Sequence, residues 1–246
     1  MDNHLPWYIK KDGSDSIVIF IHGFMGSPSQ FSSLAGIFAE KGFSAASVLL
    51  PGHGTAGLNF AKSTFRDWEE HLQSELDRFS DYKKIFLVGH SIGGLLALNA
   101  SAGISRIESV TAVASPLKFY YFAGLFRKLK LLFSKNAELK KAYLEAYSIN
   151  MSFLTYFLLG RVFMQPFLLA KKTKANLKNI TVPVLIIHSE KDETVSFKSS
   201  EMFEKGLVNA SETILRLKDS NHGYAPQADR EMIADSITEF ICSQNI

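Results

Sequence analysis

The stretch that decides the fold is "KIFLVGHSIGG", residues 84–94. Its first seven residues form an apolar run that is typical of a buried strand, and small residues that favour a helix follow over 92–103. Ser91 stands between the two. Gly89 and Gly93, two residues to either side, leave room for a tight turn that would hold Ser91 in a strained conformation. The same pattern also occurs in ordinary glycine-rich bends, so the surrounding sequence has to decide between a nucleophile and a structural turn.

Strands and helices alternate along most of the chain. Buried strands are also predicted at 17–22, 43–50, 109–115, 183–189 and 212–218, and helices at 28–41, 65–80 and 229–243. Ser27 with Gln30, and Thr64 with Asp67, are spaced to cap two of these helices. Gly42 is a natural left-handed terminator for the first of them. The alternation predicts an α/β fold, with a doubly wound, mostly parallel sheet and helices on both faces.

The alternation stops over residues 117–178, where no clear buried strand is found. Aromatic residues, leucines and lysines recur there at helical spacing. We therefore expect a core made of residues 1–116 and 179–246, with a helical cap or lid inserted at 117–178. The most apolar part of the insert, 153–170, is interrupted by Arg161, so it is interpreted as a buried or interfacial helix and not as a membrane span.

Composition and charge argue against several classes of protein. A chain of 246 residues with a formal net charge of +3 has no dominant basic stripe, so no nucleic-acid partner is expected. The first 16 residues show no apolar signal sequence, and the single cysteine, Cys242, cannot form an internal disulfide. A cytoplasmic location is therefore expected. The chain lacks the spacings typical of metal or nucleotide sites, so no metal and no cofactor are expected.

Two further reactive side chains follow predicted strands. Asp192 comes just after the 183–189 strand and His222 just after the 212–218 strand. Because the carboxyl ends of parallel strands meet at one edge of a sheet, both side chains can converge there with Ser91. The chain order Ser, Asp, His is one of several unrelated orders that produce the same hydrolytic geometry. The sequence therefore favours Ser91 as a nucleophile over a mere turn residue.

Each assignment has competitors nearby in the sequence. Glu190 and Glu193 flank Asp192 and could be mistaken for the acidic residue. His53, in "PGHGT", is the nearest rival of His222, but it precedes the serine in the chain and is interpreted as structural. His4 is a more distant rival. Four further histidines are interpreted as loop-shaping residues at strand ends (His22, His90 and His188) or as a solvated helix residue (His71).

The chain resembles α/β-hydrolases of the bacterial carboxylesterase and monoacylglycerol lipase group. The resemblance covers about residues 17–243 and is weakest over 117–170, where that group carries its variable lid. The matching motifs occur in the group's order: "HGFMGSP" (22–28), "LPGHGT" (50–55), "VGHSIGG" (88–94), "HSEKDETV" (188–195) and "SNHGY" (220–224). Ser189 stands where the group's G-x-x-D-x-x-V pattern begins with glycine.

The resemblance implies a role for each of these residues. Ser91 would be the nucleophile, His222 its general base and Asp192 the residue that orients His222. The backbone N–H groups of Phe24 and Ile92 would form the oxyanion hole. The implied activity is a serine hydrolase that cleaves carboxylic esters, with short- to medium-chain acyl groups and monoacylglycerols as candidate substrates, through an acyl-enzyme on Ser91.

Other functions stay open at this point. The same machinery serves lysophospholipases and acyl-thioesterases, and a ligand-binding member of the fold could keep these residues with slow turnover. The expected partner is a small acyl ester, held in part by lid aromatics that line an apolar pocket. Lysines give the lid a basic face, for which a weak contact with a lipid surface is an alternative to simple solvation. The sequence gives no indication of oligomeric state.

Overall fold

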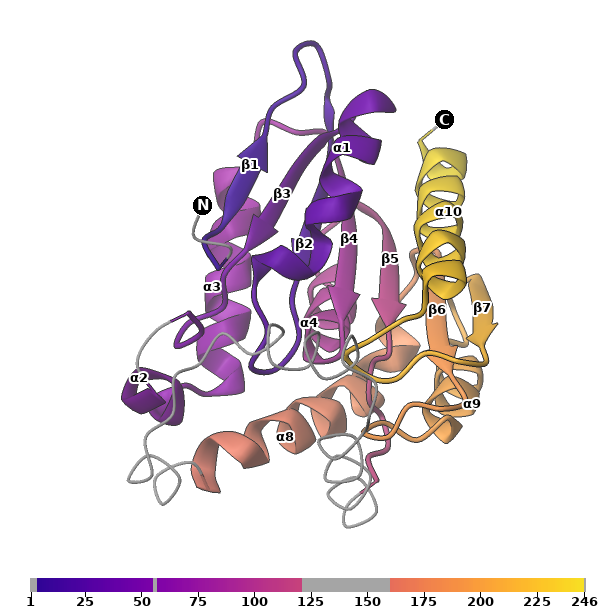
Figure 1. Cartoon of the computed structure of the whole chain (residues 1–246). Coiled ribbons are helices and arrows are strands. Elements are labelled where there is room, and N and C mark those ends of the chain that lie inside the picture. Colours follow the sequence, from indigo (N-terminus) through magenta and orange to yellow (C-terminus); the bar gives the residue numbers. More distant parts are fainter. Residues whose placement is uncertain (1–3, 55–56, 121–159, 246) are drawn as a thin grey trace.

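A seven-stranded sheet forms the centre of the computed structural model, in which residues 4–54, 57–120 and 160–245 are described. The strand order is β1-β3-β2-β4-β5-β6-β7 (Figure 1). β1 runs antiparallel to β3, and every other neighbouring pair is parallel. The strands are β1 Trp7–Ile9, β2 Ser16–Ile21, β3 Ser44–Val48, β4 Lys84–His90, β5 Ile107–Val113, β6 Val184–Ser189 and β7 Glu212–Leu217. The expectation of a mostly parallel α/β sheet is confirmed.

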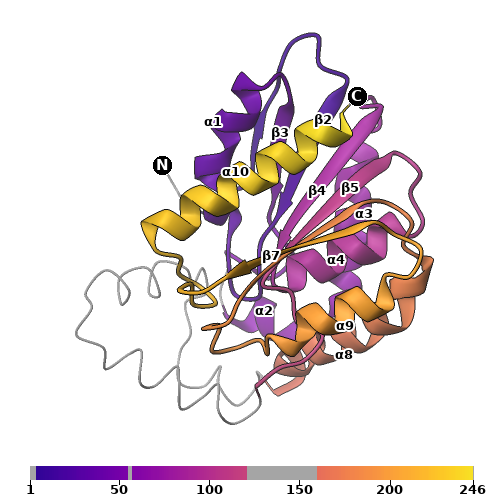
Figure 2. The same cartoon turned by 90° about the vertical axis from the view of Figure 1, so that its right-hand side faces the viewer.

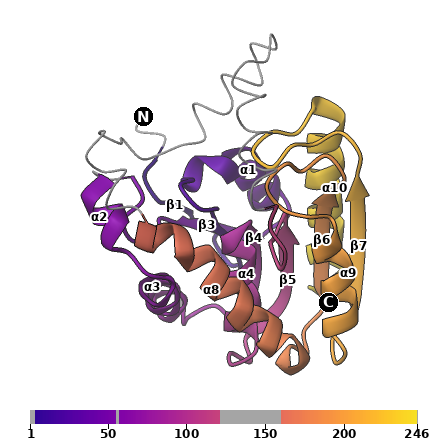
Figure 3. The same cartoon turned by 90° about the horizontal axis from the view of Figure 1, so that it is seen from below.

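Helices cover both faces of this sheet, as the two turned views show (Figures 2 and 3). One face is covered by η1 Pro28–Phe31, α1 Ser32–Glu40 and α10 Gln227–Gln244. The other is covered by α3 Phe65–Arg78, α4 Ile92–Ser101 and α9 Lys198–Gly206, with α2 Gly57–Lys62, α8 Gly160–Asn176 and the short turn η2 Leu177–Asn179 packed beside them. The sheet is thus covered on both faces, which explains why central strands such as β2, β4 and β6 are apolar without alternation.

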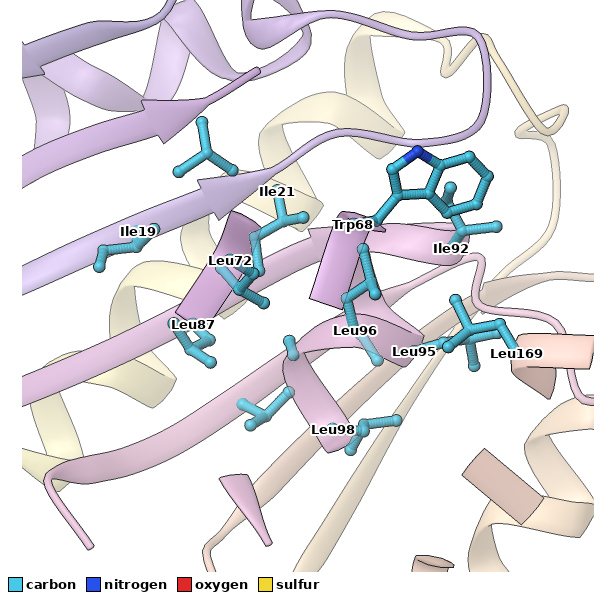
Figure 4. Close-up of a cluster of buried hydrophobic side chains, with 14 of the residues drawn as sticks. Ile19, Ile21, Trp68, Leu72, Leu87, Ile92, Leu95, Leu96, Leu98 and Leu169 are labelled. Atoms are coloured by element: carbon cyan, nitrogen blue, oxygen red, sulfur yellow. The ribbon is translucent and has the colours of Figure 1, made fainter. Parts of the chain in front are cut away.

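Two hydrophobic layers result from the alternation of side chains along each strand. In β2, Ile19 and Ile21 pack toward α3 and α4, whereas Phe20 packs toward α1 and α10. Figure 4 shows the first layer, where Trp68 and Leu72 of α3 meet the leucines of α4. Burying both faces of every central strand fixes the register, because a slip of one residue would exchange the two layers.

The predicted strands agree with the observed ones to within two residues at either end. Three elements were not predicted: β1, α2 and α9. Each is short, and β1 pairs only at the sheet edge, so their sequences carry too few residues for a periodic signal. The residue at the N-cap position of α9 is Phe197, whose side chain cannot cap, so the helix lacks the usual sequence mark of a helix start.

One of the two expected capping pairs is confirmed and the other is wrong. The Thr64 hydroxyl accepts the Asp67 N–H, and Asp67 in turn accepts the Thr64 N–H, which forms a capping box at the start of α3. Ser27 precedes a short 3-10 turn and makes no capping bond. Gln30 instead turns back and accepts the Gly23 N–H at 3.0 Å. Gly42 ends α1 with φ of 93°, as expected.

Most of the expected lid, residues 121–159, lies outside the described residues, so its boundaries stay a prediction. The described part contains α8, which lies across the lower edge of the sheet in Figure 1. Leu169 of α8 is buried among α4 residues, and Gln165 accepts the Phe65 N–H at the start of α3. None of the described helices is long and apolar enough to span a membrane.

Candidate active site

Ser91 occupies a sharp turn between β4 and α4. Its backbone has φ of 53° and ψ of −119°, a left-handed conformation that is strained for a residue with a side chain. The turn is possible because Gly89 and Gly93 have no side chains. A Cβ atom on Gly89 would lie 2.2 Å from the Gly93 carbonyl carbon, and one on Gly93 would lie 2.1 Å from the Ile21 oxygen. The Ser91 N–H is held by the Val113 carbonyl at 2.8 Å. The serine is therefore fixed at the carboxyl end of β4.

The structure brings the three predicted reactive side chains into one hydrogen-bonded chain. His222 Nε2 lies 3.1 Å from Ser91 Oγ, and His222 Nδ1 lies 2.8 Å from Asp192 Oδ2. A carboxylate only accepts, so Nδ1 carries the proton and Nε2 is free to accept from the serine hydroxyl. This is the tautomer that a general base needs.

Asp192 is fully buried and its carboxylate is saturated with donors. Besides His222, it accepts the N–H groups of Thr194 at 2.8 Å and Val195 at 2.7 Å. Burial alone would raise its pKa, but the charge and hydrogen bond of His222 and the Val195 N–H together hold the pKa below its ordinary value. Asp192 therefore stays ionised and faces the His222 ring.

The rival carboxylates take other positions. Glu193 is buried, and its Oε2 accepts the backbone N–H of His222 at 3.0 Å, while Glu190 is exposed. On the other side of the same residue, His90 Nε2 donates to the His222 carbonyl at 2.9 Å. The main chain of His222 is thus held from both sides. These two contacts of the His222 main chain were not predicted from the sequence, because no local pattern joins residues so far apart in the chain.

The two candidate oxyanion donors lie beside Ser91. A Cβ atom on Gly23 would lie 3.2 Å from the Ser91 Cβ, so the loop that carries Phe24 touches the serine. In the part of the chain that the structure describes, neither the Phe24 N–H nor the Ile92 N–H donates to another group. The Ile92 N–H also belongs to the start of α4, where the helix dipole favours negative charge. Two unpaired donors beside a serine are suited to bind an oxyanion.

Three other histidines lie in largely buried surroundings. His53, the nearest rival of His222, is buried and accepts the Met25 N–H at 3.1 Å through Nε2. His188 lies with its Nε2 3.9 Å from Asp192 Oδ2, and burial lowers its pKa. Burial likewise lowers the pKa of His90 to about 4, so this ring is neutral near pH 7. Within the described residues, no group of His, Cys, Asp and Glu side chains is arranged to hold a metal ion.

A cavity of about 450 Å³ lies next to His222 and Asp192, between α1 and α10. His222 and Asp192 form part of its wall, but Ser91 is not among its lining residues. The cavity therefore borders His222 and Asp192 and not the serine itself. The loop between β2 and η1, residues 22–27, carries Phe24 and is called the oxyanion loop below. The centroid of the Phe24 ring lies 5.5 Å from that of the Phe163 ring of α8, which gives this loop an apolar neighbour. Most of the other aromatics expected to line an acyl pocket lie outside the described residues.

Comparison with known proteins identifies the family. The model of the alpha/beta hydrolase family matches residues 18–235. The chain belongs to this family. Among curated relatives of this alpha/beta hydrolase, the thermostable monoacylglycerol lipase of Bacillus sp. (strain H-257) is 28% identical over 231 residues, covering 91% of this chain and 89% of the relative. The mitochondrial palmitoyl-protein thioesterase ABHD10 of Mus musculus is 25% identical over 247 residues, covering 95% of this chain and 78% of the relative.

Solved structures agree on the fold of this hydrolase. The crystal structure of Paleococcus ferrophilus monoacylglycerol lipase superimposes with a TM-score of 0.77 at 20% identity, covering 98% of this chain and 100% of the other. The chain therefore shares its overall fold with that lipase. The relatives support hydrolysis of an ester bond in general.

Proposed function

We propose that the protein is a serine hydrolase that cleaves carboxylic esters through an acyl-enzyme on Ser91. The observation that carries this proposal is the continuous hydrogen-bonded chain from Ser91 through His222 to Asp192, beside two unpaired N–H groups. Attack, proton transfer and oxyanion stabilisation each require one of these parts.

In the proposed reaction, Ser91 Oγ attacks the ester carbonyl carbon while its proton moves to His222 Nε2. The carbonyl π electrons become an oxyanion, which the Phe24 and Ile92 N–H groups stabilise, and Asp192 stabilises the imidazolium. Collapse of the intermediate breaks the bond to the alcohol, which leaves with the proton from His222. Water then repeats the sequence, releasing the carboxylic acid and restoring Ser91.

We propose short- to medium-chain acyl esters, including monoacylglycerols, as the substrate class. The similarity to a bacterial monoacylglycerol lipase over most of both chains supports this choice. The apolar contact between Phe24 and Phe163 supports an acyl chain that lies against the oxyanion loop. The aromatics of the expected lid would complete the pocket.

Replacing the serine tests the nucleophile. Ser91→Ala removes the attacking oxygen, so hydrolysis of a chromogenic acyl ester and labelling by a fluorophosphonate should both fall to background. Ser101→Ala is the matched control, because Ser101 lies at the other end of α4 and its hydroxyl donates to the Leu98 carbonyl of the same helix. Persistent labelling of Ser91→Ala would show that another residue is the nucleophile.

An acyl-chain series from acetyl to palmitoyl tests the substrate class. We expect kcat/KM to peak at short to medium chains and the rate to saturate while the substrate is still monomeric. A maximum at palmitoyl, or a sharp rise only above the critical micelle concentration, would instead indicate a lipase that acts at lipid surfaces.

An acyl-thioesterase is the second candidate, which the similarity to palmitoyl-protein thioesterase ABHD10 favours. The same machinery would then release a thiol in place of an alcohol. Rates on glyceryl, lysophosphatidyl and thioester substrates with one common acyl chain separate esterase, lysophospholipase and thioesterase. Tight binding with negligible turnover on all three would instead point to a ligand-binding protein.

Lipid contact and location complete the proposal. We place the enzyme in the cytoplasm, a choice supported by the presence of a single cysteine. Solvation of the lid lysines is the simplest interpretation, and a weak contact with a lipid surface is the alternative. Among the described lid lysines, Lys171, Lys172 and Lys174 are all exposed, and Lys172 forms an ion pair with Glu69 at 2.7 Å.

A further inference from the structure

Two buried histidines join the oxyanion loop to the "LPGHG" loop (50–54). His53 Nε2 accepts the Met25 N–H at 3.1 Å, and His22 Nε2 accepts the Leu50 N–H at 3.0 Å. Each loop thus supplies a histidine that holds the main chain of the other. The two rings lie edge to face with their centroids 4.7 Å apart, and both side chains are fully buried.

The hydrogen bonds admit one tautomer for each ring. His53 Nδ1 lies 3.3 Å from the Pro51 carbonyl, and His22 Nδ1 lies 2.9 Å from the Gly23 carbonyl. A carbonyl only accepts and a backbone N–H only donates, so in both rings Nδ1 carries the proton and Nε2 is bare. Protonation of Nε2 in either ring would direct a second donor at an N–H group and break the contact.

These contacts act on the peptide that carries a proposed oxyanion donor. The Gly23 carbonyl, which accepts from His22, belongs to the same planar peptide as the Phe24 N–H. Because the C=O and N–H of a trans peptide point in opposite directions, fixing the carbonyl fixes the direction of the N–H. His53 fixes the next peptide, through Met25. Without these bonds only the Gly26 N–H would hold the Gly23 carbonyl, and the Phe24 N–H would be less firmly directed toward Ser91.

The loop needs such support because its conformation is strained. Met25 has φ of 63°, a left-handed value that costs free energy for a residue with a side chain. Gln30 holds the Gly23 N–H, and the Gly26 N–H donates to the Gly23 carbonyl at 2.9 Å. As far as the described residues show, every N–H from Gly23 to Gly26 is therefore engaged except that of Phe24.

We propose that His22 and His53 are positioning residues, a reciprocal pair in the Nδ1–H tautomer that holds the Phe24 N–H in the direction needed for the oxyanion. This inference rests on the proposed hydrolase function, because it gives the loop a role only if an oxyanion forms at Ser91. Neither histidine touches the substrate or moves a proton in the reaction.

Amide substitutions test the pair, because each keeps one of the two contacts. Asparagine places its amide near the position of Nδ1, and glutamine places its amide near the position of Nε2. For His53 the important contact uses Nε2, so His53→Gln should retain most activity and His53→Asn should lose it. For His22 the important contact uses Nδ1, so His22→Asn should retain activity and His22→Gln should lose it.

The expected losses are in kcat. Removing an oxyanion donor outright costs about 10²- to 10³-fold, so a misdirected donor should lower kcat by about 10- to 100-fold while KM changes less than about threefold. Affinity for a trifluoromethyl ketone, which forms a tetrahedral oxyanion on the serine, should fall in the same two variants. Thermal melting of all four variants is the control for folding.

The proposal predicts opposite outcomes for asparagine and glutamine at the two positions, which a role in packing alone would not produce. If both substitutions at a position lower kcat equally and in step with the melting temperature, the histidines only pack the loops and the proposal is wrong. If none of the four variants lowers kcat, the proposal is also wrong.

A second measurement remains decisive if the variants fail to fold. In the wild-type protein with nitrogen-15 labelled histidines, NMR spectra should show protonated Nδ1 and bare Nε2 for His22 and His53. The opposite tautomer at either ring would overturn the proposal. This measurement does not depend on turnover, so it distinguishes failure of the pair from failure of the hydrolase function, which Ser91→Ala tests.

Discussion

Backbone strain at single residues is concentrated around the serine. Among the described residues, the non-glycine residues with positive φ are Met25, Ser91 and Ala114. All three lie just beyond the carboxyl ends of strands, next to the site. Ala114 is held there by its N–H, which donates to the Ile187 carbonyl at 2.8 Å. Strain of this kind persists where neighbouring contacts over-determine the conformation, as they do at this edge of the sheet.

Glycine substitutions test the close approach of α4 to β2. A Cβ atom on Gly93 would lie 2.1 Å from the Ile21 oxygen, so Gly93→Ala should push the start of α4 away from the sheet and lower the free energy of unfolding by about 1–3 kcal/mol. Gly36→Ala, in α1, meets no atom within 4 Å and should raise it by about 1 kcal/mol. Denaturant unfolding measures both, and equal effects would contradict the steric argument.

The two neighbouring acids should differ in their effect on turnover. Asp192→Asn removes the acceptor that fixes the His222 tautomer, so kcat should fall by about 10³- to 10⁴-fold. Glu193→Gln keeps an oxygen for the His222 N–H and should lower kcat by less than about 10-fold. Steady-state kinetics measures both variants. The reverse order would make Glu193 the residue that orients the base.

At the scale of elements, a side chain from within α8 caps the start of α3. The first N–H groups of a helix lack partners inside the helix. In α3, the Asp67 N–H is accepted by Thr64 and the Phe65 N–H by Gln165 of α8. α8 is also tied to α4 by Thr173, whose hydroxyl accepts from Asn99 at 3.1 Å. The end of the expected lid insert is therefore anchored to the core.

Removing the cap of α3 should cost measurable stability. Thr64→Ala deletes the side-chain half of the capping box and should lower the free energy of unfolding by about 1 kcal/mol. Thr64→Ser keeps the hydroxyl and should stay within about 0.5 kcal/mol of the wild type. Denaturant unfolding compares the two variants, and an equal loss in both would show that the Thr64 methyl group, and not its hydroxyl, stabilises α3.

At the scale of the whole molecule, folding buries several histidines in neutral form. Burial lowers the pKa of His53 and of His90 to about 4, and burial with the nearby His53 lowers the pKa of His22 well below its ordinary value. In the unfolded chain the same groups titrate near 6.5. As the pH falls below 6.5, the unfolded state therefore takes up protons that the folded state does not, and stability declines.

The protein should accordingly lose stability at mildly acidic pH. Each such histidine removes about 1.4 kcal/mol per pH unit between pH 6.5 and its folded pKa, and Asp192, whose pKa is lowered, adds a further loss only below its unfolded value of 3.8. We expect the free energy of unfolding to drop steeply between pH 6.5 and about 4, with uptake of three or more protons.

Denaturant titrations at several pH values measure this uptake. His53→Gln removes one of these buried titrating rings, so its uptake should be smaller than that of the wild type by about one proton. A free energy of unfolding that stays flat from pH 6.5 to 4.5 would contradict the lowered pKa values.

The sequence by itself determined the central strands, the turn at Ser91 and the chain order of Ser91, Asp192 and His222. These follow from local features, namely continuous apolar runs, paired glycines and residues placed directly after strands. When helices cover both faces of a parallel sheet, reactive side chains gather at the edge formed by the carboxyl ends of the strands. The position of each residue directly after a strand was therefore enough to predict that the three lie together.

Only the tertiary structure decided which partner each side chain takes. Gln30 holds Gly23 and makes no capping box, Glu193 faces the His222 main chain while Asp192 faces its ring, and His53 holds Met25. β1, α2 and α9 likewise became visible only there. These outcomes depend on hydrogen bonds and packing between segments that are distant in the chain, where hydrophobic period and capping patterns carry no information. The physical reason is that burial forces each polar group to find a partner, and geometry in three dimensions selects which one.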